Sequence, residues 1–256
     1  MISCREYASI KKEEYRNCQE KMSLSIVQIG EDPASNTYVK GKIKDCEEVG
    51  IKTYLFKLPE DIDQSCLNRT IGLAVYDEQG VIVPFPIPKH LEIDKLLIRP
   101  RLDVDGLFYD YYNPCTPEGI IDWLEYNNIE LSNKHVVIIG RGKLVGKPLA
   151  QMMLDKNATV SLCHSFTEEK KLKTLVENGD IIVSAVGLPE YFKWDVPSSK
   201  YGEKIFIDAG INRNKDGKLC GDFDFKYLTA QGHYVTPVPG GVGLLTRVTL
   251  LKHLIQ

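Results

Sequence analysis

The sequence has no long apolar run and no paired arrangement of cysteine or histidine, and each absence excludes a class of protein. No apolar segment approaches the ~20 residues that a membrane-spanning helix needs. The opening M-I-S-C-R-E-Y lacks the apolar core of a secretory signal. The seven cysteines form no C-x-x-C pair and the five histidines are dispersed, so neither a zinc site nor a disulfide framework is predicted. Free thiols are typical of a reducing compartment, and we expect a cytoplasmic protein without metal or membrane partner.

The chain also lacks a charge excess, an internal repeat and a low-complexity tract. Its net charge is −3, with 26% charged and 43% hydrophobic residues, which gives no basic footprint for nucleic acid. Its 256 residues are enough for one large domain or two modest ones.

Strand and helix patterns alternate along the whole chain, which predicts an α/β fold with largely parallel sheets. The expected strands cover residues 24–29, 52–58, 81–83, 135–139, 159–163, 181–185 and 204–208. The expected helices cover 35–49, 66–76, 93–98, 117–127, 145–154 and 244–254. Ser35 and Thr116 are predicted N-caps, and Gly50 a C′ residue. A pause at N-P-C-T-P sets a domain boundary near residue 115, between an N-terminal domain (1–115, with 236–256 returning to it) and a Rossmann-type domain (116–235).

The segment H-V-V-I-I-G-R-G-K-L-V-G-K-P places Gly140, Gly142 and Gly146 between a strand and a helix. Glycines there let the backbone approach a pyrophosphate, which the helix N-terminus then binds. A tight turn without a ligand is the alternative. The following strand ends C-H-S-F-T without the acid typical of NAD enzymes. Because Arg141 lies within the turn, NADP is favoured over NAD. His164 is either a catalytic base or a ligand-side or structural residue at the tip of the strand.

In S-N-T-Y-V-K-G-K, Tyr38 and Lys42 are four residues apart and share one helix face. A tyrosine can stack on an aromatic ligand and a lysine can exchange a proton, although both also occur on ordinary solvated helices. Short-chain dehydrogenases use this spacing after the glycine turn, whereas here it precedes it. Asp103 and Asp105, in D-V-D-G, either cap a turn or bind an amino-pyrimidine donor edge.

Taken together, these segments resemble the methylenetetrahydrofolate dehydrogenase/cyclohydrolase family. The matching stretches run in family order over residues 23–250 and are G-E-D-P-A-S, Y-V-K-G-K, D-V-D-G-L, P-C-T-P-E-G-I, G-R-G-K-L-V-G-K-P, A-T-V-S-L-C-H-S, S-A-V-G, D-A-G-I-N-R, G-D-F-D-F and T-P-V-P-G-G-V-G. The resemblance implies a folate-side catalytic domain, an NADP-binding Rossmann domain, a cleft between them and a homodimer. The implied reactions are oxidation of 5,10-methylenetetrahydrofolate and hydrolysis of the methenyl product to 10-formyltetrahydrofolate.

The resemblance also assigns roles to residues. Lys42 would be the catalytic lysine, serving hydrolysis if its pKa is lowered, Tyr38 would stack on the folate and Asp105 would bind the pterin amino edge. Pro239 and Gly243 would line the folate pocket. Gly140, Arg141, Gly142, Ser165 and Ile211 would hold the cofactor, with Arg141 and Ser165 at the 2′-phosphate.

Four positions depart from the family pattern: Pro84 replaces a glutamine beside the catalytic lysine, Gly142 a serine, Phe166 a basic residue and Leu244 a proline. Three alternatives therefore stay open. The chain is a bifunctional enzyme, a dehydrogenase with weak or no cyclohydrolase activity, or a non-catalytic binding paralogue. Retention of Tyr38, Lys42, Asp105 and Arg141 favours an enzyme.

Overall fold

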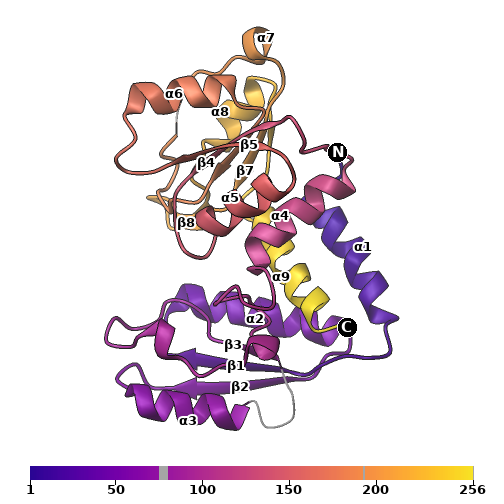
Figure 1. Cartoon of the computed structure of the whole chain (residues 1–256), viewed down its shortest axis with the longest axis vertical. Helices are drawn as coiled ribbons and strands as arrows, with labels where there is room; N and C mark the ends of the chain where they lie inside the picture. Colours follow the sequence, from indigo (N-terminus) through magenta and orange to yellow (C-terminus); the bar gives the residue numbers. More distant parts are fainter. Residues whose placement is uncertain (75–79, 193, 256) are drawn as a thin grey trace. The chain divides into compact units, whose positions relative to one another are not determined.

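The computed structural model describes residues 1–74, 80–192 and 194–255 (Figure 1). By their contacts these residues form two compact units. The three-stranded unit comprises Ser9–Cys115 and Arg247–Gln256, and the five-stranded unit comprises Met1–Ala8 and Thr116–Thr246. The sequence-based division placed residues 1–8 and 236–246 in the N-terminal domain, whereas the contacts group them with the five-stranded unit.

The three-stranded unit is built on a parallel sheet in which β1 (Leu24–Ile29) lies between β2 (Thr53–Leu58) and β3 (Gly80–Ile82). Helices α2 (Pro33–Glu48) and α3 (Gln64–Ala74) follow β1 and β2 and lie on opposite faces of this sheet (Figure 1). The other elements with residues in this unit are α1 (Cys4–Arg16), α9 (Val242–His253) and the 3-10 turns η1 (Ile93–Lys95) and η2 (Pro100–Leu102). Residues 75 and 76 of the predicted third helix lie outside the described residues.

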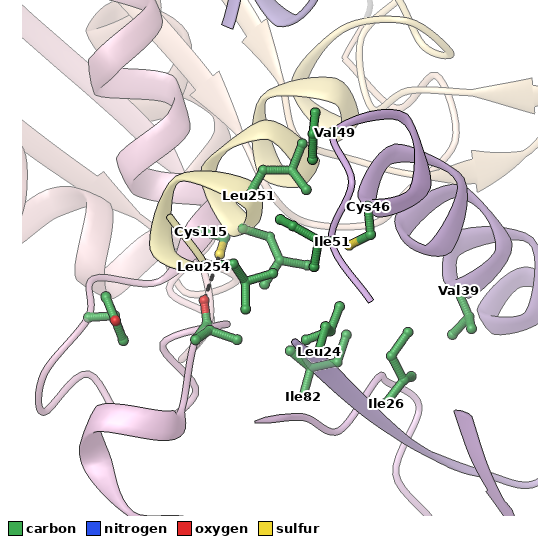
Figure 2. Packing of buried hydrophobic residues seen from close by; sticks show 13 residues of the cluster. Leu24, Ile26, Val39, Cys46, Val49, Ile51, Ile82, Cys115, Leu251 and Leu254 are labelled. Carbon is green, nitrogen blue, oxygen red and sulfur yellow. Dashed lines mark hydrogen bonds between the residues drawn. The ribbon is translucent and has the colours of Figure 1, made fainter. Parts of the chain in front are cut away.

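Side chains alternate between the two faces of β1. Leu24 and Ile26 join a buried cluster with Val39 of α2 (Figure 2). The Ser25 hydroxyl instead donates to the carbonyl of Ala74, at the end of α3 (3.1 Å). Because successive residues of a strand point to opposite faces, the even-numbered positions of β1 face α2.

Helix α2 begins earlier than the sequence predicted. The side chain of Asp32 accepts a hydrogen bond from the Ser35 amide (2.7 Å) and caps the helix, with Pro33 at its first position. The prediction of Ser35 as N-cap is therefore wrong, because an equally suitable cap lies three residues upstream. Gly50, with φ +78°, occupies the left-handed conformation expected after a helix.

The five-stranded unit is a parallel sheet of the Rossmann type, as predicted, and its strand order is β10-β7-β6-β4-β5. Its strands are β4 (His135–Ile139), β5 (Thr159–Cys163), β6 (Ile181–Ser184), β7 (Ile205–Asp208) and β10 (Tyr234–Val235), with a small hairpin of β8 (Asn212–Arg213) and β9 (Leu219–Cys220). Its helices include α4 (Cys115–Tyr126), α5 (Gly146–Asp155), α6 (Glu169–Asn178), α7 (Ser198–Tyr201) and α8 (Phe225–Ala230).

Two further expectations need correction. Thr116 is not the cap of α4, because Cys115 is already helical; the Thr116 hydroxyl lies 2.9 Å from that of Thr246. The helix predicted over 93–98 is only the 3-10 turn η1, because Leu96 already has extended angles (φ −71°, ψ 129°). Within the described parts of the chain, no helix is both long and apolar enough to cross a bilayer.

Candidate active site

Lys42 and Asp105 form an ion pair in the three-stranded unit. The lysine Nζ lies 3.1 Å from Oδ1 and 3.0 Å from Oδ2 of the carboxylate. The lysine side chain is only 1% exposed, whereas that of the aspartate is 27% exposed. A buried charge requires a partner, and here the partner itself remains accessible to another molecule.

This pair controls the protonation of Lys42. Burial would by itself lower the pKa of Lys42, because water no longer stabilises the ammonium. The charge of Asp105, with smaller contributions from Tyr38 and Cys115, outweighs burial and raises the pKa above its ordinary value. The hydrolytic role inferred from the resemblance requires a lowered pKa, so proton exchange at Lys42 depends on what happens to Asp105.

Tyr38 lies one turn before Lys42 on α2, as the spacing predicted. The ring of Tyr38 is half-buried, and its centroid lies 5.1 Å from the lysine Nζ. Long helical side chains lean toward the N-terminus of their helix, which brings the ammonium back over this ring. The structure thus brings Tyr38, Lys42 and Asp105 together.

The turn D-V-D-G separates the roles of its two aspartates. Asp103 is buried and accepts a hydrogen bond from the amide of Phe108 (2.9 Å), so it caps the turn. Asp105 points at Lys42. Gly106 has φ +68°, and a Cβ there would collide with the carbonyl of Asn113. This turn therefore needs its glycine to present Asp105.

A buried group behind the ion pair escaped the sequence analysis. The Cys115 thiol donates to the carbonyl of Val104 (3.3 Å), and His253 Nδ1 lies 2.8 Å from the same oxygen. The rings of His253 and Tyr112 stack with centroids 4.4 Å apart. Only P-C-T-P hinted at Cys115. His253 lies in the last turn of α9, and nothing in the sequence linked it to this group.

The glycine turn of the five-stranded unit shows which of its glycines are required. Gly140 has φ +112°, and a Cβ there would lie 2.5 Å from the carbonyl oxygen of Ala185. A Cβ on Gly146 would collide with the backbone of Gly140. Gly142 has no heavy atom within 4 Å of its would-be Cβ, so serine would also fit there, and nothing in the structure explains the departure from the family pattern.

Helix α5 starts directly after this turn without a side-chain cap. Its N-cap residue is Val145, which cannot accept a hydrogen bond from the first-turn amides. Two first-turn positions of the helix offer no free amide, because the Lys147 amide donates to the Gly142 carbonyl (3.1 Å) and Pro148 has no N–H. The fit to the pyrophosphate of a dinucleotide therefore rests on the glycine turn, where the open space at Gly142 lets a ligand approach the backbone.

Arg141, on the exposed side of the turn, contacts Phe166. Its guanidinium carbon lies 5.7 Å from the Phe166 ring centroid, within the range of a cation–π contact. Phe166 and Ser165 are exposed at the tip of the turn after β5. His164 closes this turn, because its Nδ1 accepts from the Phe166 amide (3.2 Å). The local geometry thus gives His164 a structural role.

Two buried carboxylates, absent from the predicted site, order the loops after β6 and β7. Asp222 accepts hydrogen bonds from the Ser184 hydroxyl (2.7 Å) and the Leu188 amide (2.9 Å). Asp208 accepts from the Gly210 amide (3.0 Å), next to Ile211, which is 57% exposed. Burial, with the charge of Asp222, raises the pKa of Asp208 to about 6.

Pro239, Gly243 and Leu244 belong to the five-stranded unit. Pro239 is exposed in the loop before α9, and a Cβ on Gly243 would meet no atom within 4 Å. Leu244 is partly buried in α9. Over residues 1–74, 80–192 and 194–255, no group of three or more His, Cys, Asp or Glu side chains could hold a metal.

Comparison with known proteins identifies the family. Residues 3–105 match the catalytic-domain model, and residues 114–256 the NAD(P)-binding-domain model, of tetrahydrofolate dehydrogenase/cyclohydrolase. The bifunctional protein FolD of Bacillus cytotoxicus is 43% identical over 244 residues, which are 90% of this chain and 83% of that protein.

Two solved structures are also similar. The bifunctional enzyme FolD of Campylobacter jejuni is 34% identical with a TM-score of 0.89, covering 99% of this chain and 96% of that one. The FolD of Trypanosoma brucei, complexed with NADP and an inhibitor, is 28% identical with a TM-score of 0.84, covering 99% and 95%. The chain described here belongs to the tetrahydrofolate dehydrogenase/cyclohydrolase family.

Proposed function

We propose that the chain oxidises 5,10-methylenetetrahydrofolate with NADP and hydrolyses the 5,10-methenyl product to 10-formyltetrahydrofolate. Family membership supports both activities. The single observation that carries the chemistry is the ion pair of buried Lys42 with accessible Asp105. Through this pair, the protonation of the lysine depends on whether a substrate is bound to the carboxylate.

In the oxidation, NADP supplies the acceptor for the hydride that leaves the methylene carbon between N5 and N10. The residues of this chain bind and orient. The ring of Tyr38 offers a face for the folate, and Asp105 accepts from the amino edge of its pterin. Positioning of this kind accelerates a transfer that needs no proton at the reacting carbon.

In the hydrolysis, water adds to the methenyl carbon and loses a proton. The hydroxyl of this adduct then loses its proton as the formyl C=O forms, the bond from that carbon to N5 breaks, and N5 takes up a proton, so that one proton is released overall. When the amino group of the pterin donates a hydrogen bond to Asp105, the carboxylate is shared between the pterin and Lys42. Burial then counts more heavily against the ammonium of Lys42, and the free amine can take the proton of the attacking water. Substrate binding itself therefore prepares the base.

The preference for NADP rests on Arg141 and Ser165, which are exposed beside the glycine turn. A guanidinium and a hydroxyl suit a 2′-phosphate better than a 2′-hydroxyl. The Phe166 ring against Arg141 supports this assignment, because it restricts the guanidinium without neutralising it.

We further propose a cytoplasmic homodimer. All seven cysteines are free, five of them buried, which fits a reducing compartment. Strand β5 forms an edge of the five-stranded sheet, and an uncovered edge can pair with a second copy. Light scattering that shows a monomer at micromolar concentration would exclude the dimer.

The two activities are tested by supplying methylenetetrahydrofolate with NADP and following reduced cofactor and methenyl absorbance separately. We expect reduced cofactor to form while the methenyl product decays faster than in buffer. Decay at the buffer rate would leave only a dehydrogenase. Folate binding without either signal would leave a non-catalytic binding protein.

The role of Lys42 is tested by Lys42→Met against the matched control Lys40→Met, which removes an exposed lysine from the same helix. General acid–base catalysis contributes about 10²–10⁴-fold. We expect Lys42→Met to lower hydrolysis by about 10²-fold or more and hydride transfer far less. Equal loss of both activities would refute the role as base.

A further inference from the structure

We propose that Gln28 is a positioning residue for Lys42 in the hydrolytic step, supplying from β1 the amide that Pro84 cannot supply from the adjacent strand. This inference rests on the proposed function. No motif of the family resemblance includes Gln28, and its role follows from strand register, burial and hydrogen bonding.

Gln28 is a polar residue in the buried strand L-S-I-V-Q-I and is only 1% exposed. Burying an amide is unfavourable unless its groups find partners. As an even-numbered residue of β1, Gln28 points to the face covered by α2, the helix that carries Lys42. Its Nε2 donates to Asn36 Oδ1 of α2 (2.7 Å), which confirms this orientation.

The pairing of β1 with β3 ends two residues before Gln28 and Pro84. Leu24 of β1 pairs with Gly80 of β3, and Ile26 with Ile82. Position 28 follows Ile26 by two residues, just as position 84 follows Ile82, and from this we infer that the two positions lie near each other. Both side chains are buried. Because neighbouring strands lie about 4.8 Å apart, we infer that the side-chain amide of Gln28 can reach nearly the same region as a side-chain amide at position 84. The proline at position 84 offers no side-chain hydrogen bond.

A chain of hydrogen bonds fixes which end of the amide is available. Asn36 Nδ2 donates to Glu31 Oε2 (3.2 Å), and Lys57 Nζ binds the other oxygen of Glu31 (3.0 Å). Asn36 therefore presents its oxygen to Gln28, and the nitrogen of Gln28 is committed to it. The amide is left with its carbonyl oxygen Oε1 as the acceptor that it can offer Lys42.

A neutral acceptor is what the hydrolytic step needs. The lysine Nζ leans toward the N-terminal end of α2, where Tyr38 and Asn36 lie. A carboxylate beside Nζ favours the ammonium, as Asp105 does. An amide oxygen can instead hold the amine in place at a much smaller cost to deprotonation. Gln28 would therefore orient Lys42 once the substrate has engaged Asp105.

The test compares wild type, Gln28→Leu and the double variant Gln28→Leu/Pro84→Gln, assaying both activities. Gln151→Leu, which removes an exposed glutamine from α5, is the matched control. We expect Gln28→Leu to lower hydrolysis by about 10-fold or more, to change hydride transfer by less than about 3-fold, and to be rescued by glutamine at position 84. A merely structural role would not give rescue from another strand.

Gln28→Glu provides a second measurement. A carboxylate there raises the pKa of Lys42, so the pH–rate profile of hydrolysis should shift to higher pH. Hydrolysis by Gln28→Leu within twofold of wild type, or equal loss of both activities without rescue, or an unshifted profile for Gln28→Glu, would overturn the role of Gln28. Absence of hydrolysis in wild type would instead overturn the proposed function, and this inference with it.

Discussion

Asp105→Asn removes the charge that neutralises buried Lys42 while it keeps the shape of the side chain. At an effective dielectric constant of about 20, two unit charges 3 Å apart interact by about 5 kcal/mol. The Asp105 side chain is 27% exposed, so water screens part of this energy. We expect a coupling free energy of about 2–4 kcal/mol between Lys42 and Asp105.

The double-mutant cycle of Lys42→Met and Asp105→Asn measures this coupling. Both tryptophans, Trp123 and Trp194, lie in the five-stranded unit, so their fluorescence would not report on the three-stranded unit. Hydrogen exchange of the α2 amides reports its opening free energy directly. Asp105→Asn should lose protection, and Lys42→Met added to it should restore part, because the unpaired buried charge is gone.

The pH dependence of stability tests the same ion pair independently, because wild type and Asp105→Asn should respond to pH in opposite directions. In wild type the pKa of Lys42 is raised above 10.5, so its stabilisation is complete below pH 10.5 and is lost above the folded-state pKa. In Asp105→Asn burial lowers the pKa, so a penalty present at neutral pH should disappear as the pH approaches 10.5. Protection equal to wild type within about 0.5 kcal/mol at neutral pH, or a deficit that does not shrink with pH, would refute this account.

Two further perturbations address the five-stranded unit. Arg141→Ala should raise KM for NADP by about 10–100-fold, because a charge-assisted hydrogen bond contributes about 1.5–3 kcal/mol. It should change KM for NAD by less than about 3-fold. Steady-state kinetics with each cofactor measures both constants, and equal effects on the two would contradict the role of Arg141 at the 2′-phosphate. Burial raises the pKa of Asp208 from 3.8 to about 6. The protonated carboxyl therefore contributes about 3 kcal/mol to the free energy of unfolding below pH 3.8, and this contribution is lost as the pH rises through about 6. Relative to Asp208→Asn, wild type should therefore lose about this much unfolding free energy between pH 4 and 7 in tryptophan-monitored denaturation, and a constant difference would contradict the raised pKa.

The sequence predicted strands β4 and β5 residue for residue, because their apolar runs end at glycine or polar residues that cannot continue them. Helix starts were harder to predict. D-P-A-S contains two residues able to cap α2, and only the fold selects Asp32. Propensity cannot distinguish neighbouring caps when the entry of the chain into the helix decides between them.

Within the site, spacing predicted that Tyr38 and Lys42 share a face, and the family resemblance added Asp105. The ion pair itself joins residues 63 positions apart, and the depth of Lys42 determines its energy. Neither depth nor long-range pairing can be obtained from local pattern. For the same reason His253 and Gln28 stood out only once the strands and α9 were in place.

The register of β1 with β3 also bears on how such enzymes can change over time. Under the role proposed for Gln28, two positions distant in the chain can supply the same functional group, so that group can move from strand to strand through an intermediate that carries both or neither. A comparison of sequences, column by column, would record one loss and one unrelated gain. A comparison of the pockets in three dimensions would instead show that the same functional group is still present.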